Sequence, residues 1–210
     1  MLKRPLGHAF LIGLGGTGRQ SLTQLAASLC ELTMADLEAS RNYSEEQWRL
    51  DLKATLLAAG QEGKNSVLLL PDSKICGDFM LDDVNNLLNA GAVPNLFQPD
   101  ERIQIEESLR GAAKKAGRLT LHTSGTHEDY EDYFVERTVT NLHVVLAMSP
   151  VGEALRSRIR NFPSLVNCCT IDWHSSWPDE ALEAVCNQIL DDVDLELEQR
   201  RNIGKACVQL

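Results

Sequence analysis

The sequence predicts an α/β protein, a three-layer α/β/α sandwich in which a five-stranded parallel sheet is covered by helices on both faces. Three observations lead to this class. Short apolar runs alternate with helical patterns along the chain, and a glycine-rich loop joins the first run to the first helical pattern. The chain also has 210 residues, 43% of them hydrophobic, which suffices for one core of ordinary single-domain size.

Each strand is predicted from a continuous apolar run, because a strand that is buried on both faces shows no polar alternation. Residues 8–12 form the first run and lead directly into the glycine-rich loop, so they predict a strand, loop and helix unit. The other four predicted strands cover residues 34–38, 67–70, 142–147 and 165–171.

The helices are predicted from apolar residues at helical spacing. Behind the loop, this spacing is shown by Leu22, Leu25, Ala26 and Leu29. A second stripe consists of Met80, Val84, Leu87 and Leu88. Residues 99–115 and 130–138 predict two further helices, and residues 117–127 an exposed loop between them.

The last part of the chain predicts a change from sheet to helices. Pro178 and Asp179 have the residue types that favour the first turn of a helix, and Leu182, Val185 and Ile189 follow at helical spacing. We therefore expect residues 1–174 to form a large α/β subdomain and residues 175–210 to begin a small helical one.

The charge and the cysteines exclude several classes of function. Lys and Arg number 20 against 30 Asp and Glu, and the formal charge of −10 makes nucleic acid and anionic membranes poor partners. The six cysteines show no zinc-binding spacing, which predicts buried free thiols. No apolar run has the length of about 18 residues that a membrane-spanning helix needs.

The glycine-rich loop has two functional interpretations, both based on backbone N–H groups that hold a phosphate at a helix start. Gly13, Gly15 and Gly18 match the dinucleotide pattern G-x-G-x-x-G, with Glu38 about 20 residues further on for a ribose. The same segment fits the phosphate-binding Walker A loop, except that Arg19 and Gln20 replace its lysine and its magnesium-binding hydroxyl. A purely structural turn is the third alternative.

Asp72 is the second candidate site residue. It follows the apolar run 67–70, where phosphate-transferring proteins place an acid that orients Mg²⁺. The next residue is Ser73, which cannot act as the glutamate base of an active ATPase. A solvated turn acid is the alternative.

Several stretches resemble, in the same order, the fourth AAA+ module of axonemal dynein heavy chains. They are residues 13–22 (GLGGTGRQSL), 81–89 (LDDVNNLLN), 93–97 (VPNLF), 141–152 and 162–173 (FPSLVNCCTIDW). The resemblance covers nearly the whole chain. It implies the large subdomain of an AAA+ P-loop NTPase, with strand order 5-1-4-3-2, followed by the start of the helical lid.

The resemblance also implies the roles of individual residues. Asp72 corresponds to the Walker B acid, which holds Mg²⁺ through water, and Ser149 stands in the sensor-one position. Arg160 is the favoured candidate for an arginine finger that reaches the preceding module, ahead of Arg156 and Arg158; a solvated helix face is the alternative for these arginines. The implied phosphate loop comprises Gly13, Gly15, Gly16, Thr17, Gly18, Arg19, Gln20 and Ser21.

The implied function is that of a nucleotide-binding module of a microtubule-based motor. Arg19, Gln20 and Ser73 depart from the active pattern, and losing a positioned base typically removes about 10²–10⁴-fold in rate. We therefore expect bound ATP or ADP, with or without Mg²⁺, and little or no hydrolysis. The implied partners are the neighbouring AAA+ modules and, through the whole motor, microtubules and dynein intermediate and light chains, in the cytoskeleton of a cilium or flagellum. A nucleotide-free scaffold module and a dinucleotide-dependent oxidoreductase are the alternatives.

Overall fold

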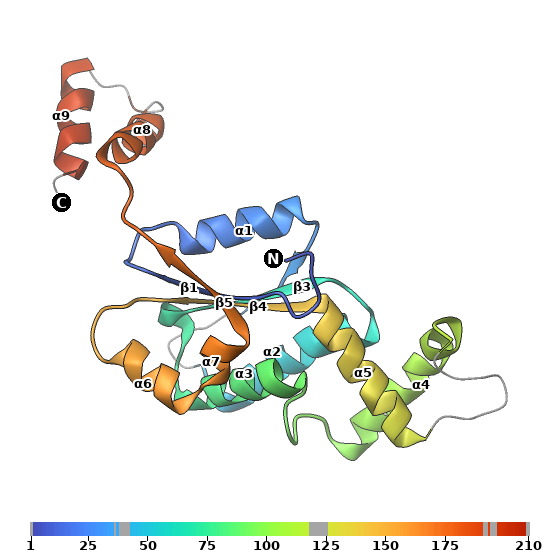
Figure 1. Cartoon of the computed structure of the whole chain (residues 1–210). Coiled ribbons are helices and arrows are strands. Elements are labelled where there is room, and N and C mark those ends of the chain that lie inside the picture. Colours follow the sequence, from blue (N-terminus) through green and yellow to red (C-terminus); the bar gives the residue numbers. More distant parts are fainter. Residues whose placement is uncertain are drawn as a thin grey trace.

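A computed structural model of the chain describes residues 2–35, 37, 43–117, 126–190, 193 and 197–208. Its centre is one sheet of five parallel strands in the order β2–β3–β4–β1–β5 (Figure 1). The strands are β1 (His8–Gly13), β2 (Thr33–Met34), β3 (Ser66–Pro71), β4 (Leu142–Met148) and β5 (Cys169–His174). The predicted class and the order 5-1-4-3-2 are confirmed.

The position of β1 decides between the two folds that the glycine loop allows. In a dinucleotide-binding sheet, the first strand lies between the second and the fourth. Here β1 pairs with β4 on one side and with β5 on the other. The oxidoreductase interpretation is therefore wrong, and Glu38, on which it also depended, lies outside the described residues.

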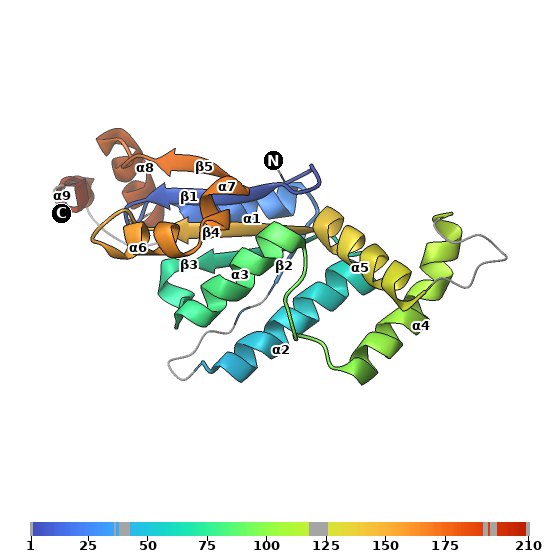
Figure 2. The same ribbon diagram turned by 60° about the horizontal axis from the view of Figure 1, so that its bottom comes forward.

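The two faces of the sheet are covered unequally (Figures 1 and 2). On one face, α1 (Arg19–Leu29) packs over a small cluster that includes Ala9, Leu11 and Ala27. The other face carries the large core, where alternate strand residues such as Phe10 and Leu68 meet the helices. These helices include α2 (Glu45–Leu56), α3 (Asp78–Ala90), α6 (Ala154–Asn161) and α7 (Ser164–Asn167).

A buried polar contact joins α2 to α3. Ser44 and Gln47 form a capping box that fixes the start of α2 and places Trp48 one residue later. Trp48 is fully buried, and its indole N–H donates a 2.9 Å hydrogen bond to the Asp83 carboxylate on α3. The end of α2 widens into a π-helical turn, η1 (Leu57–Gln61), which packs on α5 (His127–Asn141).

The remaining helices extend the body at two ends. The predicted helix over residues 99–115 is confirmed as α4 (Pro99–Lys115), which packs against α5. Most of the loop predicted between them lies outside the described residues. A short 3₁₀ turn, η2 (Asp72–Lys74), follows β3. Beyond β5, α8 (Asp179–Leu190) and α9 (Leu197–Val208) pack on one another, away from the sheet (Figure 1).

Two predicted strands have different bounds in the structure. The strand predicted at residues 165–171 begins only at Cys169, because Leu165 lies in α7 and is fully buried in the large core. The strand predicted at residues 34–38 is reduced to Thr33–Met34, and neither Ala35 nor Leu37 belongs to it.

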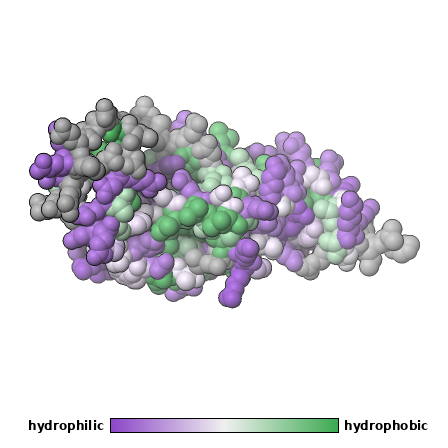
Figure 3. All heavy atoms as spheres, turned by 90° about the horizontal axis from the view of Figure 1, so that it is seen from above, coloured by the Kyte–Doolittle hydropathy of each residue, from purple (hydrophilic) through white to green (hydrophobic). Residues whose placement is uncertain are grey.

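The predicted helix after the loop is confirmed as α1, and its leucine stripe faces outward. Thr23 and Ala27 face the sheet, where the small side chains allow the helix to approach closely. Leu22, Leu25 and Leu29 are 44%, 56% and 74% exposed. α1 lies on the side from which Figure 3 is viewed, and this face shows a hydrophobic area at its middle.

The predicted apolar face of α8 is exposed at Leu182, Val185 and Ile189. The prediction for the thiols needs correction. Full burial was predicted for the free thiols, but Cys76 is exposed and the other described thiols are half-buried. Among the described residues, no helix is long and apolar enough to span a membrane, and no cluster of His, Cys, Asp and Glu could hold a metal ion.

Candidate functional site

The predicted site residues meet at one edge of the sheet, because each follows the carboxyl end of a parallel strand. The glycine loop follows β1, Asp72 follows β3 and Ser149 follows β4. These three strands are neighbours in the order β3–β4–β1. Open α/β sheets bind their ligands at this edge.

The glycines of the loop are required by its backbone. Gly16 and Gly18 both have φ of +79°, a conformation that side chains rarely adopt. At Gly13, an added Cβ would lie 2.9 Å from the carbonyl oxygen of His174 in β5. At Gly15 and Gly16 an added Cβ would meet nothing within 4 Å. The tight turn explains Gly13, Gly16 and Gly18 by itself, so evidence for a ligand must come from the groups around the loop.

The first turn of α1 offers free backbone donors. Its first intrahelical hydrogen bond runs from the Leu22 N–H to the Gly18 carbonyl at 2.8 Å, so the N–H groups of Arg19, Gln20 and Ser21 precede it. Gly18 provides no side-chain cap, and no acidic residue lies in this turn. The positive end of the helix dipole is thus uncompensated, as an anion-binding turn requires.

Arg19 lies over this loop and has an unused donor. Its Nη2 donates to the Leu14 carbonyl at 3.1 Å, and the buried Thr17 hydroxyl donates to the same oxygen at 2.9 Å. The other terminal nitrogen, Nη1, is buried and has no hydrogen-bond partner among the described residues. Buried donors are nearly always satisfied, so this nitrogen can donate to a further acceptor, such as an ordered water or an anion.

Asp72 lies at this edge, and both of its carboxylate oxygens are engaged. One accepts a hydrogen bond from the Ser149 N–H, and the other forms an ion pair with Arg158 of α6. The hydroxyl of Ser149 accepts from the Val151 N–H at 3.3 Å. The Asp72 carboxylate is therefore paired with an arginine of the same chain.

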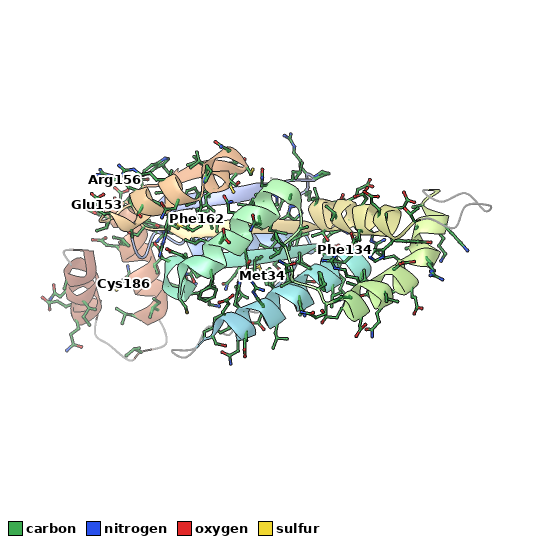
Figure 4. The ribbon with its side chains drawn as sticks, turned by 90° about the horizontal axis from the view of Figure 1, so that it is seen from below. Met34, Phe134, Glu153, Arg156, Phe162 and Cys186 are labelled. Atoms are coloured by element: carbon green, nitrogen blue, oxygen red, sulfur yellow. The ribbon has the colours of Figure 1, made fainter. Side chains whose placement is uncertain are left out.

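The three arginines of α6 differ in their surroundings. Arg156 pairs with Glu153 at 3.2 Å, and both side chains lie exposed at the same end of α6 (Figure 4). Arg160, the favoured arginine finger, is exposed and has no ion pair within the described part of the chain. Arg158 lies on the opposite side of the helix from Arg156, since the two are 200° apart at 100° per residue. It follows the buried Leu155 by three residues, a spacing that could have identified it in the sequence.

A tryptophan that was not predicted as a site residue borders the loop. Trp177 packs on Gly18, where an added Cβ would lie 3.2 Å from the indole. With Thr17, Leu22 and His174 it lines a hollow of about 290 Å³ beside the loop. The indole of Trp177 is 39% exposed and so presents a partly open aromatic surface.

The fold and the site together define a class of protein. A parallel sheet in the order 5-1-4-3-2, with a glycine loop leading into α1 and an acid behind β3, is the P-loop NTPase fold of the AAA+ type.

Comparisons with known proteins narrow this class. The family described as P-loop containing dynein motor region D4 matches residues 1–210, and the chain belongs to this family. It is 44% identical to human dynein axonemal heavy chain 6 over 100% of the chain, and 41% identical to mouse dynein axonemal heavy chain 3 over 99%. The Chlamydomonas reinhardtii dynein-1-beta heavy chain of the flagellar inner arm I1 complex is 46% identical over 93%. The chain spans only 4–5% of the length of these relatives.

Proposed function

We propose that this chain is a nucleotide-binding module of an axonemal dynein motor ring, which holds ATP or ADP with weak or absent hydrolysis. The main observation in support is the buried Nη1 of Arg19. This atom lacks a partner among the described residues and belongs to the first residue of α1, which has no side-chain cap. The triphosphate or diphosphate chain supplies the missing acceptors. The residues of the predicted phosphate loop, Gly13 and residues 15–21, are its expected contacts.

Slow chemistry follows from the residues around Asp72. Ser73 occupies the position of the base that would activate water, and it is exposed. Ser149 has the sensor-one position, but its hydroxyl already accepts from the Val151 N–H. Without a base, a rate loss of about 10²–10⁴-fold is typical. A structural or regulatory role in the ring accords with such a site.

The residues fit a nucleotide phosphate better than they fit magnesium. Arg19 and the free N–H groups of α1 provide donors for phosphate oxygens. For Mg²⁺, Asp72 is engaged by Arg158, and Gln20 replaces the usual hydroxyl ligand. Coordination of Mg²⁺ by Asp72 therefore competes with Arg158 for the carboxylate.

The hollow beside Gly18 provides room for the base of the nucleotide. Trp177 can stack on a purine, a contact worth about 1–3 kcal/mol in proteins that bind bases on aromatic side chains. Because Trp48 is fully buried, quenching of tryptophan fluorescence by ATP is expected to come from the exposed Trp173 and Trp177. Trp177→Phe should reduce the quenching more than Trp173→Phe does.

Thermal unfolding of the 210-residue chain with ATP, ADP or NAD tests the proposal. A ligand at 100 times its dissociation constant stabilises a protein by about 2.7 kcal/mol. We expect ATP or ADP to raise the midpoint and NAD to leave it unchanged. Steady-state turnover of about 1 s⁻¹ or more would contradict the hydrolysis-poor role.

The whole motor extends this function to partners that the chain does not contain. We propose that neighbouring AAA+ modules of the same heavy chain flank it, with Arg160 reaching the preceding one. Residues 175–210 would begin its helical lid. Microtubules and dynein intermediate and light chains would be partners of the whole protein, located in the axoneme of a cilium or flagellum. The formal charge of −10 disfavours direct contact of this module with an acidic filament.

A nucleotide-free scaffold module is the second candidate. The observation that favours it is the contact of Arg19 with the Leu14 carbonyl, which places the guanidinium across the loop. In that case, none of the three ligands would change the unfolding midpoint.

A further inference from the structure

We propose that Arg158 takes the place of the metal at this site, so that the module binds a nucleoside polyphosphate without Mg²⁺. The inference rests on the proposed nucleotide binding, and it concerns which form of the nucleotide is bound. Its basis is the pairing of Asp72 with an arginine of its own chain.

The pairing engages both oxygens of the Asp72 carboxylate. Its Oδ1 forms the ion pair with Arg158 Nη1, and its Oδ2 accepts from the Ser149 N–H. Mg²⁺ demands close, nearly octahedral oxygen ligands and is usually held by one or two carboxylates together with phosphate oxygens. A guanidinium on the same carboxylate occupies the oxygen and repels the cation.

The fold holds Arg158 in this position. It extends from the inward side of α6, three residues after Leu155, which is 7% exposed. Its Nη1 also lies 4.0 Å from the sulfur of Met148, the last residue of β4. The side chains of Arg158 and Asp72 are 21% and 33% exposed, so the ion pair is less screened than a pair at the open surface.

The remaining residues compensate for a missing metal with fixed positive charge. Gln20 stands where a hydroxyl would bind Mg²⁺. Arg19 Nη1 has a free donor over the loop, and Arg158 provides a second guanidinium at the neighbouring strand end. Both guanidinium groups can donate charge-assisted hydrogen bonds to phosphate oxygens, and Arg19, for which the described residues show no ion pair, also adds a net positive charge.

Calorimetric titration of the 210-residue chain with ATP, once with Mg²⁺ and once with EDTA, tests the inference. The unchanged chain should bind with dissociation constants that agree within about threefold. Arg158→Gln frees the Asp72 carboxylate, and we expect ATP to bind about tenfold more tightly with Mg²⁺ than with EDTA. Adding Asp72→Asn to this variant should abolish the difference. Arg110→Gln, which removes an equal charge from the exposed side of α4, should behave like the unchanged chain.

A second measurement without nucleotide separates the two proposals. Unfolding midpoints of Arg158→Gln, Asp72→Asn and the double variant form a mutant cycle, and an ion pair should make their shifts non-additive. Additive shifts overturn the role of Arg158 whether or not ATP binds. Binding by the unchanged chain that requires Mg²⁺ overturns the metal-free site and leaves nucleotide binding intact. Non-additive shifts without ATP binding in either buffer reject the proposed function, and the metal-free site with it.

Discussion

At the scale of single residues, buried histidines make the stability depend on pH. His8 is 6% exposed, and its Nδ1 accepts a 3.0 Å hydrogen bond from the Val144 N–H. Burial, with His143 nearby, lowers the pKa of His8 from 6.5 to about 4. Because the folded pKa lies below the unfolded one, stability is fully present above pH 6.5 and is lost as the pH falls towards 4.

The expected loss is about 3 kcal/mol, since each pKa unit corresponds to about 1.4 kcal/mol. Urea unfolding at several pH values between 7 and 4 measures it. His8→Gln retains an acceptor but does not titrate, so its stability should fall less over this range. His143, whose pKa burial also lowers, is the matched second site, and His143→Gln should have a smaller effect of the same sign. An equal pH dependence in all three proteins would contradict the assignment.

Substitutions at Gly13 and Gly15 provide a matched test, also at the scale of single residues. Gly13→Ala places a methyl group 2.9 Å from the His174 carbonyl oxygen, whereas nothing lies within 4 Å at Gly15. We expect Gly13→Ala to lower the free energy of unfolding by about 1–3 kcal/mol, as overpacking does. Gly15→Ala should change it by less than about 0.5 kcal/mol. Equal losses in urea titrations would show that the contact with β5 is not the cause.

At the scale of elements, α1 is held by its small residues. Ala27 is fully buried against the sheet, and Ala27→Leu should cost about 1–3 kcal/mol. Leu29 is 74% exposed, so Leu29→Gln should leave stability within about 0.5 kcal/mol. Light scattering should also show less self-association for Leu29→Gln, because it interrupts an exposed apolar stripe. A larger loss of stability at Leu29 than at Ala27 would reverse the assigned faces.

The same elements show what the sequence could predict. The runs that form β1, β3 and β4 are buried on both faces, and their apolar composition was sufficient to identify them. Helical spacing identified α1, but it does not state which face a tertiary neighbour will cover. Leu165 belongs to an apolar run and was assigned to a strand, although the chain turns there and buries it in α7.

The candidate site could also be predicted in part from the sequence. The glycine loop and Asp72 follow predicted strands, so their meeting at one sheet edge follows from parallel topology. The ion pair of Asp72 with Arg158 does not follow from the topology, because it depends on how α6 lies across that edge. Local sequence patterns also do not predict the contact of Trp177 with Gly18, because this contact depends on the path of the chain after β5.

At the scale of the whole molecule, we propose that the sheet and the two last helices are separable parts of the chain. The described residues of α8 and α9 pack on one another, away from the sheet (Figure 1). A chain ended at residue 174 should therefore keep a cooperative urea transition. It should also bind ATP more weakly, because Trp177 is removed. Loss of cooperative unfolding would contradict the proposed boundary.

The close approach of β5 to the loop has a mechanical consequence. His174 lies against Gly13, and three residues later Trp177 lies against Gly18, immediately before α8 begins. A force on α8 is therefore transmitted to both ends of the glycine turn through the four residues 174–177. Conversely, a change that tightens the glycine turn would alter the angle between α8 and the sheet.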